Sequence, residues 1–181
     1  MRLFFAFPPP KSTIKYLQQH LQKLVKNFPH WDWIAPRDWH ITILFLPQVS
    51  AAKERELITE AKKIFSHFSG FSFTSSEWKF FPSFHSHLLF LSLTSSPPLY
   101  PLQQQLKKLA EKLELGPTSF HPPHLTVARK IKIKSNNLKG LSKELNSFSP
   151  FSWVNTKIVL YQSLRQYQLH YWPRDEFYLK K

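Results

Sequence analysis

The residues best suited to chemistry in this sequence are two histidines that each stand two positions before a threonine. His40 and Thr42 lie in the apolar stretch WHITILFL, and His124 and Thr126 lie in PHLTVAR. In a β-strand, positions i and i+2 project to the same face. Each motif therefore predicts a strand that presents one imidazole and one hydroxyl on one side, opposite its apolar side chains.

Two imidazoles that share a cleft can catalyse displacement at phosphorus. A neutral imidazole can take a proton from the attacking hydroxyl or water, while an imidazolium gives a proton to the leaving oxygen. Histidine suits both roles because its unperturbed pKa of about 6.5 populates both forms near neutrality. Each threonine hydroxyl can donate to a nonbridging phosphate oxygen, and the chemistry needs no metal ion and no cofactor. A lone His-x-Thr is usually structural, so this hypothesis depends on the two copies meeting in one site.

Composition narrows the classes of protein that fit. The 181 residues contain no cysteine, which excludes thiol catalysis, disulfides and cysteine-ligated zinc. The 25 Lys and Arg against 11 Asp and Glu give a formal net charge of +14, which favours polyanionic partners such as RNA, although a basic solvated surface that keeps the protein soluble has the same composition. No apolar run is long enough to cross a bilayer, so we expect a cytoplasmic protein with no membrane association.

Hydrophobic periodicity predicts alternating strands and helices along the chain. Apolar stripes at helical spacing predict helices over residues 12–26, 51–66 and 99–113, with a short helical patch at 138–145. Apolar or alternating runs predict strands over residues 2–7, 39–46, 71–73, 77–81, 87–93, 120–133, 153–160 and 170–179. This order indicates an α+β fold whose sheets are covered on one side by helices. Because each half has a helix leading into a His-x-Thr strand and no linker separates the halves, we expect one bilobal domain over residues 1–181 with lobes related by a pseudo-twofold axis.

The motifs also resemble a known family. MRLFFAF, WIAPRDWHITILFL, FHPPHLTVAR and LYQS are similar to the corresponding stretches of the 2H phosphoesterases, and specifically of the bacterial and archaeal RNA 2′,3′-cyclic phosphodiesterases, also called 2′-5′ RNA ligases. The resemblance implies a bilobal fold of two antiparallel sheets that face a central cleft, with helices on their outer faces. It also implies metal-independent opening of a terminal 2′,3′-cyclic phosphate to a 2′-phosphate, with a weak reverse ligation joining a 2′-phosphate end to a 5′-hydroxyl end.

The resemblance assigns roles to five residues. By position it makes His40 and His124 the acid/base pair, Thr42 and Thr126 the phosphate ligands, and Arg129 a residue that stabilises the phosphate. Arg129 is an odd number of residues from His124, so strict alternation directs it away from the cleft. Its role therefore requires a β-bulge or a turn at the end of the strand.

Further candidates lie close to the two motifs. Phe45 is a possible stacking platform for a base, although core packing explains most phenylalanines. Lys130 and Lys132 alternate with isoleucine directly after the second motif, where they could hold an RNA backbone or form the solvent face of an edge strand.

The sequence therefore predicts a monomeric enzyme whose partner is RNA ending in a 2′,3′-cyclic phosphate or a 2′-phosphate. Two alternatives remain open at this point. One is a 2H phosphodiesterase that acts on 2′-5′ oligonucleotides or small cyclic nucleotides. The other is an RNA-binding module without catalysis, which should bind RNA whether or not its end is cyclised and should show no bell-shaped pH dependence.

Overall fold

Antiparallel strands rich in aromatic and branched residues form the body of the protein. The computed structural model describes residues 1–81, 87–131, 141, 143, 145–164 and 171–180. The helices are α1 (Lys11–Asn27), α2 (Ala51–Phe65), α3 (Tyr100–Lys112) and the short 3-10 helix η1 (Pro36–Asp38). The strands are β1 (Leu3–Phe7), β2 (Asp32–Trp33), β3 (Ile41–Leu46), β4 (Phe71–Phe81), β5 (His87–Ser96), β6 (His124–Ile131), β7 (Ser152–Asn155), β8 (Lys157–Ser163) and β9 (Tyr171–Tyr178).

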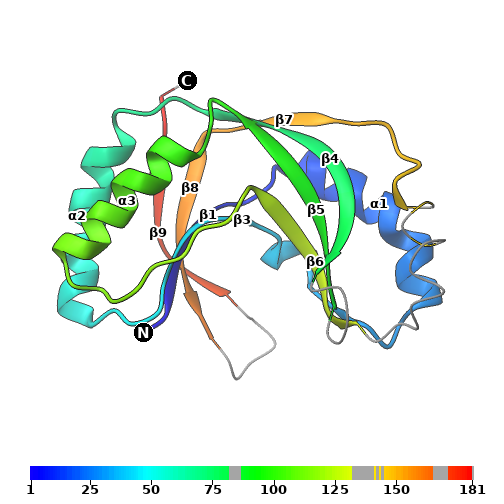
Figure 1. Cartoon of the computed structure of the whole chain (residues 1–181), viewed down its shortest axis with the longest axis horizontal. Coiled ribbons are helices and arrows are strands. Elements are labelled where there is room, and N and C mark those ends of the chain that lie inside the picture. The colour runs from blue at the N-terminus through cyan, green and yellow to red at the C-terminus, as the bar shows by residue number, and fades with distance from the viewer. Residues whose placement is uncertain (82–86, 132–140, 142, 144, 165–170, 181) are drawn as a thin grey trace.

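The strands pair in the order β7-β4-β5-β6-β3-β1-β8-β9, and β2 adds to the edge of β6. Every pairing among these named strands is antiparallel. The two central strands, β3 and β6, meet at one residue pair, Ile41 with Leu125, which we call the joint. The expected α+β class is confirmed, but the expected two sheets are the two halves of one connected, curled sheet, because the ladder continues through the joint (Figure 1).

The helices cover the two half-sheets from outside. In Figure 1, α2 and α3 lie together beside the β3-β1-β8-β9 half, while α1 lies beside the β4-β5-β6 half. Tyr16 and His20 of α1 contact Phe151 and Trp78, with ring centroids 4.6 and 6.0 Å apart. Since α1 directly follows β1 but covers the opposite half-sheet, each lobe is built from both halves of the sequence.

Most predicted elements lie within a few residues of their observed bounds. The two short strands expected at residues 71–73 and 77–81 are one strand, β4, with a register irregularity between Ser75 and Trp78, and the strand expected at 153–160 is split into β7 and β8. The pattern gave no sign of β2 or η1. The helical patch expected at 138–145 lies largely outside the described residues.

One hydrophobic cluster joins both lobes. It contains residues of α1, α2 and α3 together with both residues of the joint, which are each 0% exposed. On the other face of β1, Phe4, Ala6 and Tyr171 form a small second cluster, against which Phe45 and Tyr161 pack. Within the described chain, no helix is both long and apolar enough to span a membrane.

Truncating the joint should destabilise the whole protein. Ile41 is fully buried where the two half-sheets meet, so we expect Ile41→Ala to lower the free energy of unfolding by about 2–5 kcal/mol and Ile41→Val by only about 0.5–1.5 kcal/mol. Urea denaturation of both variants measures the difference. Equal and small effects would show that the joint contributes little to stability.

Candidate active site

The joint brings the two His-x-Thr motifs side by side. In an antiparallel pair, moving one residue forward on one strand means moving one residue back on its partner. Continuing the register by one position on either side therefore sets His40 beside Thr126 and Thr42 beside His124. The four side chains are half-buried, whereas the residues that alternate with them are buried in the core. Both motifs thus project from the same face of the connected sheet.

Both imidazoles are oriented in the same way by the backbone. Nδ1 of His40 bonds to the carbonyl oxygen of Asp38 at 2.7 Å, and Nδ1 of His124 bonds to that of Pro122 at 2.9 Å. Because a carbonyl oxygen only accepts, each Nδ1 must carry the hydrogen and donate it. In each neutral ring this leaves Nε2 as the basic nitrogen, so both rings hold the tautomer that acid/base catalysis through Nε2 requires.

Three aromatic rings surround the imidazole of His40. The centroids of Phe4 and Tyr171 are each 4.8 Å from that of His40, and the centroid of Tyr161 is 6.3 Å away. Burial also raises the pKa of the Tyr161 hydroxyl to about 12. The Tyr161 hydroxyl beside His40 is therefore uncharged at neutral pH.

The surroundings of His40 favour its neutral form. Burial lowers its pKa to about 4, the hydrogen bond to the Asp38 carbonyl opposes this shift, and the positive charges of Arg129 and His124 lower the pKa further. In the free protein His40 is therefore a neutral base at neutral pH.

His124 occupies a more open place than His40. Its ring contacts Phe90 edge-on, with centroids 5.4 Å apart, and the ring of the exposed His121, 6.3 Å away. The buried side chain of Gln103, on α3, donates from Nε2 to the carbonyl oxygens of Ile43 at 3.2 Å and of His121 at 3.3 Å. One amide thus fixes the strand of the first motif against the loop that leads into the second.

Arg129 reaches the same face through a bulge in β6. Leu89 of β5 pairs with Ala128, but the next residue, Phe90, pairs with Thr126, so β6 contains one extra residue between Thr126 and Ala128. The extra residue restores Arg129 to the side of the two motifs, as its expected role requires. Its Nη2 donates to the hydroxyl of Tyr171, and its guanidinium carbon lies 5.9 Å from the centre of that ring.

A cavity of about 260 Å³ lies beside the first motif. It contains two guanidinium groups, which suit a phosphate or another anion. The residues that line it are Arg2, Phe4, His40, Thr42, Phe45, Arg129, Ser163 and Tyr171. Phe45 lies where it can contact a ligand, whereas His124 and Thr126 adjoin the cavity across the joint rather than lining it.

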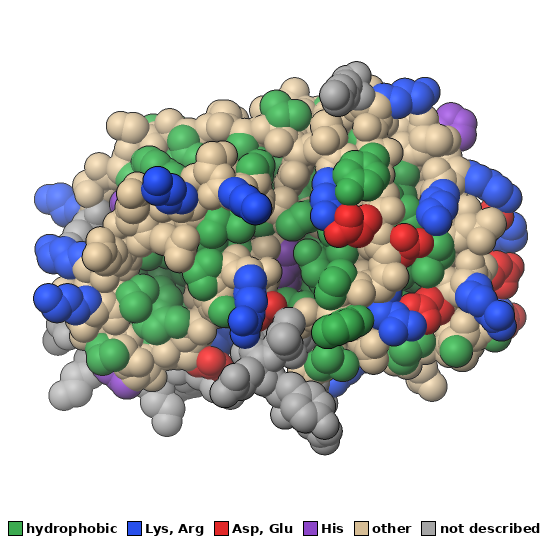
Figure 2. Space-filling view, turned by 180° about the vertical axis from the view of Figure 1, so that it is seen from behind, with side chains coloured by type: hydrophobic (Ala, Val, Ile, Leu, Met, Phe, Trp, Pro, Cys, Tyr) green, Lys and Arg blue, Asp and Glu red, His purple; other side chains and the backbone are tan. Residues whose placement is uncertain are grey.

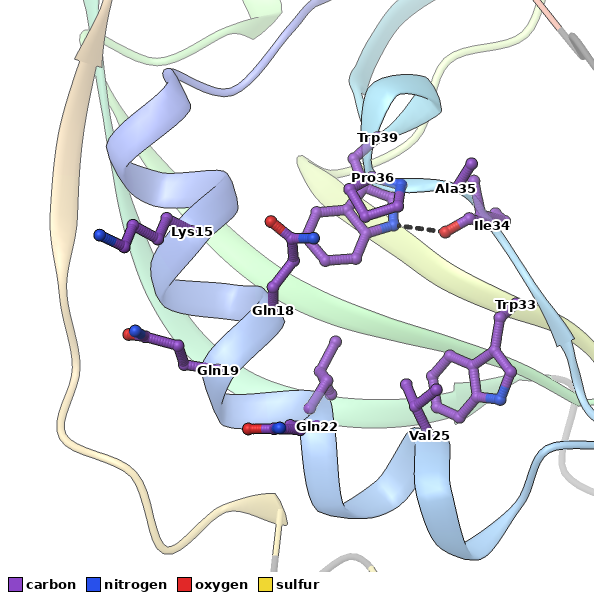
Figure 3. Close-up of a pocket in the computed structure, with 11 residues that line it drawn as sticks. Lys15, Gln18, Gln19, Gln22, Val25, Trp33, Ile34, Ala35, Pro36 and Trp39 are labelled. Atoms are coloured by element: carbon purple, nitrogen blue, oxygen red, sulfur yellow. Dashed lines mark hydrogen bonds between the residues drawn. The ribbon is translucent and has the colours of Figure 1, made fainter.

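Trp39, the neighbour of His40 in the first motif, does not line this cavity. Trp39 faces away from His40 and donates its indole N–H to the carbonyl of Ile34 at 3.0 Å. Figure 3 shows it in a groove of about 530 Å³ between α1 and residues 33–36. Lys132 lies outside the described residues, as does the side chain of Lys130. In the part of the chain that the structure describes, no group of three or more His, Asp or Glu side chains could hold a metal ion.

Sequence reasoning missed several residues around the cavity. Phe4 escaped notice because every residue of β1 is apolar, so the pattern does not show which ones face the site. Arg2 and Ser163 lie in the stretches MRLFFAF and LYQS, but nothing in those stretches singles them out, and Tyr171 lies in no motif. Arg2 directly precedes β1, which pairs with β3, while Ser163 and Tyr171 reach the cavity because β8 pairs with β1 and β9 pairs with β8.

Comparisons with known proteins agree with this geometry. The fold and site define an α+β protein with paired His-x-Thr motifs, and the family model of the 2′-5′ RNA ligase superfamily matches residues 17–166. The chain therefore belongs to the 2′-5′ RNA ligase superfamily, and the resemblance inferred from its motifs is confirmed.

Individual relatives cover nearly the whole chain. An RNA 2′,3′-cyclic phosphodiesterase of Thermotoga maritima is 23% identical over 164 residues, which are 90% of this chain and 87% of the relative. A crystal structure of a Thermus thermophilus protein has a TM-score of 0.79 at 20% identity, over 99% of this chain and 98% of that chain. The structure of E. coli LigT complexed with 3′-AMP has a TM-score of 0.73 at 25% identity, with the same coverage.

Phosphate binding should raise the pKa of His40. In the free protein the ring faces the positive charges of Arg129 and His124, and a phosphate anion between them would offset that repulsion. We expect the His40 resonance in NMR titrations to move from a pKa of about 4 to a value about one unit or more higher when inorganic phosphate is added. An unchanged pKa at saturating phosphate would show that the anion binds elsewhere.

Removing the charge of Arg129 should weaken phosphate binding. A hydrogen bond to a charged group is worth about 1.5–3 kcal/mol, so we expect Arg129→Gln to weaken phosphate binding by about tenfold or more. Calorimetric titration of the variant against Arg37→Gln, a matched change at an arginine of η1 outside the cavity, measures the effect. Equal affinities in the two variants would exclude Arg129 from the anion site.

Proposed function

We propose that this protein opens 2′,3′-cyclic phosphates at the ends of RNA to 2′-phosphates, with His40 and His124 as the acid/base pair. The observation that carries the proposal is the shared face of the two motifs. Both imidazoles have Nδ1 fixed by a backbone carbonyl, and both stand at the joint next to the cavity that contains Arg129.

The proposed reaction is an in-line displacement by water at phosphorus. The water oxygen forms a bond to phosphorus while the bond from phosphorus to O3′ breaks, which leaves a 3′-hydroxyl and a 2′-phosphate. Nε2 of one histidine takes the proton from the water, and Nε2 of the other, as an imidazolium, gives a proton to O3′. The protonation state of His40 in the phosphate complex decides the two roles. A neutral His40 would be the base, and a protonated His40 would be the acid. A 5′-hydroxyl in place of water would instead form a 2′-5′ linkage.

The remaining residues of the site would stabilise the phosphate. The hydroxyls of Thr42 and Thr126 can donate to its nonbridging oxygens, where charge develops in the transition state. Arg129, and Arg2 at the rim of the cavity, would neutralise the anion. Phe45, from the same cavity, would contact the attached nucleoside.

The charge distribution supports an RNA substrate. On the face shown in Figure 2, most acidic side chains lie over the lobe that carries α2 and α3. Most of the charged side chains on the other lobe are Lys and Arg. The α1 segment itself contains Lys11, Lys15, Lys23 and Lys26 and no acidic residue. A lobe of this charge attracts an RNA backbone toward the site.

The relatives point to the same chemistry. The Thermotoga maritima protein is named an RNA 2′,3′-cyclic phosphodiesterase, and E. coli LigT was crystallised with a nucleoside monophosphate, 3′-AMP. Carried to this chain, these names support a hydrolase that acts on phosphorylated RNA ends.

Product analysis tests the substrate and the reaction together. The purified protein, with EDTA present, should convert a short RNA with a 2′,3′-cyclic phosphate end to the 2′-phosphate form, identified by chromatography against 2′- and 3′-phosphate standards. Turnover of only 2′-5′ oligonucleotides or small cyclic nucleotides would move the substrate to those classes. RNA binding without any turnover would identify a binding module.

Each catalytic histidine should be indispensable. We expect His40→Ala and His124→Ala each to lower kcat by about 100-fold to 10,000-fold, because each removes one proton transfer. His67→Ala, at an exposed histidine that follows α2, is the matched control and should keep full activity. Circular dichroism and thermal melting check that each variant is folded. Normal turnover in either variant at the motifs would overturn the two-histidine mechanism.

A further inference from the structure

A second cavity lies beside the residues that lead into the second motif. It has a volume of about 490 Å³ and is formed by the end of β5, the start of α3 and residues 120–123. Tyr100, Gln103, Phe120 and His121 line it. Among these lining residues, the mechanism above uses none as a catalytic group. We call this cavity the Tyr100 pocket.

The Tyr100 pocket is directly connected to His124. Pro122, whose carbonyl accepts the hydrogen bond from Nδ1 of His124, is part of its wall. The ring of His121, another part of the wall, contacts that of His124 at 6.3 Å. His121 therefore both lines the pocket and contacts His124, which sets the pocket beside the candidate active site.

The wall of the pocket has the chemistry that a nucleoside requires. Tyr100 is 59% exposed although it is a large aromatic residue, and its ring meets Phe120 edge-on at 6.0 Å. Aromatic faces of this kind stack bases with little dependence on sequence. Phe120 packs against the hydrophobic core, and Tyr100 is the first residue of helix α3, so both rings belong to the folded body of the protein.

Gln103 supplies a buried polar group at the same place. Its side chain is 4% exposed, and its Nε2 donates to two backbone carbonyls. With its amide hydrogens used in this way, Gln103 meets a ligand through its oxygen, as a hydrogen-bond acceptor. Gln103 lines the same pocket as Tyr100 and Phe120, and a few fixed polar groups among aromatic residues are typical of a pocket for a small ligand.

We propose that the Tyr100 pocket binds a ribonucleoside that is joined to the phosphate in the active site. The proposal rests on the proposed function, because that function brings a nucleoside to the phosphate. Two nucleosides of a substrate are joined to this phosphate, and either of them would fit the aromatic and polar wall of the pocket. One carries the cyclic phosphate itself, and the other lies beyond the phosphate in a 2′-5′ linked dinucleotide.

Substrates with and without bases test the pocket. Tyr100→Leu should lower kcat/KM for adenosine 2′,3′-cyclic phosphate about tenfold through KM, because stacking is lost, while leaving kcat/KM for base-free glycerol 1,2-cyclic phosphate unchanged. If the pocket holds the second nucleoside, the tenfold loss will appear instead in cleavage of adenylyl-(2′→5′)-adenosine. Tyr178→Leu, at a tyrosine that is 68% exposed on β9, is the matched control. Equal losses with all three substrates, or no loss relative to the control, would overturn the proposal.

Binding measurements separate this proposal from the proposed function. Adenosine 2′-monophosphate and adenylyl-(2′→5′)-adenosine are titrated calorimetrically into the wild-type protein and into both variants, which needs no turnover. We expect Tyr100→Leu to weaken binding of at least one of them about tenfold, with the wild-type affinity kept in Tyr178→Leu. If the wild-type protein binds these ligands but hydrolyses nothing, the proposed function fails and the pocket stands. If Tyr100→Leu binds both as the wild type does, or if neither binds the wild type, the pocket proposal fails even where hydrolysis succeeds.

Discussion

The pairing of Ile41 with Leu125 is the contact on which the site depends. It is the point where two half-sheets, each with its own helices, become one connected sheet. Because side chains alternate along strands, this register also decides that His40, Thr42, His124 and Thr126 share a face. A shift of the pairing register by one residue on one strand would turn the motif of that strand into the core, while the motif of the other strand would stay on its face. The same buried pair thus stabilises the fold and assembles the candidate site.

Burial and charge around His40 both favour its neutral form. Aromatic rings remove it from water, and Arg129 and His124 add positive charge nearby, so the free protein holds a neutral imidazole beside a cationic cavity. An anion relieves this repulsion, whereas a neutral ligand does not. An anion such as phosphate would therefore relieve the charge on this cavity before any contact with a base is made. Under the proposed function, specificity for a nucleoside would come from the aromatic residues on the Phe45 side and in the Tyr100 pocket.

Much of this arrangement could be predicted from local patterns. Helical periodicity located α1, α2 and α3, and the repeated His-x-Thr spacing identified four residues that the fold brings together. The need for a bulge before Arg129 also followed from counting positions along β6. Long-range pairing was not accessible in the same way. That β8 places Tyr161 and Ser163 beside β1, or that Tyr171 of β9 lies against His40, depends on contacts between residues more than a hundred positions apart. Uniformly apolar β1 does not show which face it turns to the site.

The central claim is that both motifs act on one phosphate. The most direct measurement is a crystal structure of the protein with adenosine 2′-monophosphate, in which the distances from the phosphate oxygens to Nε2 of His40 and Nε2 of His124 are read. If both motifs act on one phosphate, both distances will be about 2.6–3.2 Å, as proton transfer requires. A phosphate bound to one imidazole, with the other turned away or well beyond hydrogen-bonding distance, would contradict the claim.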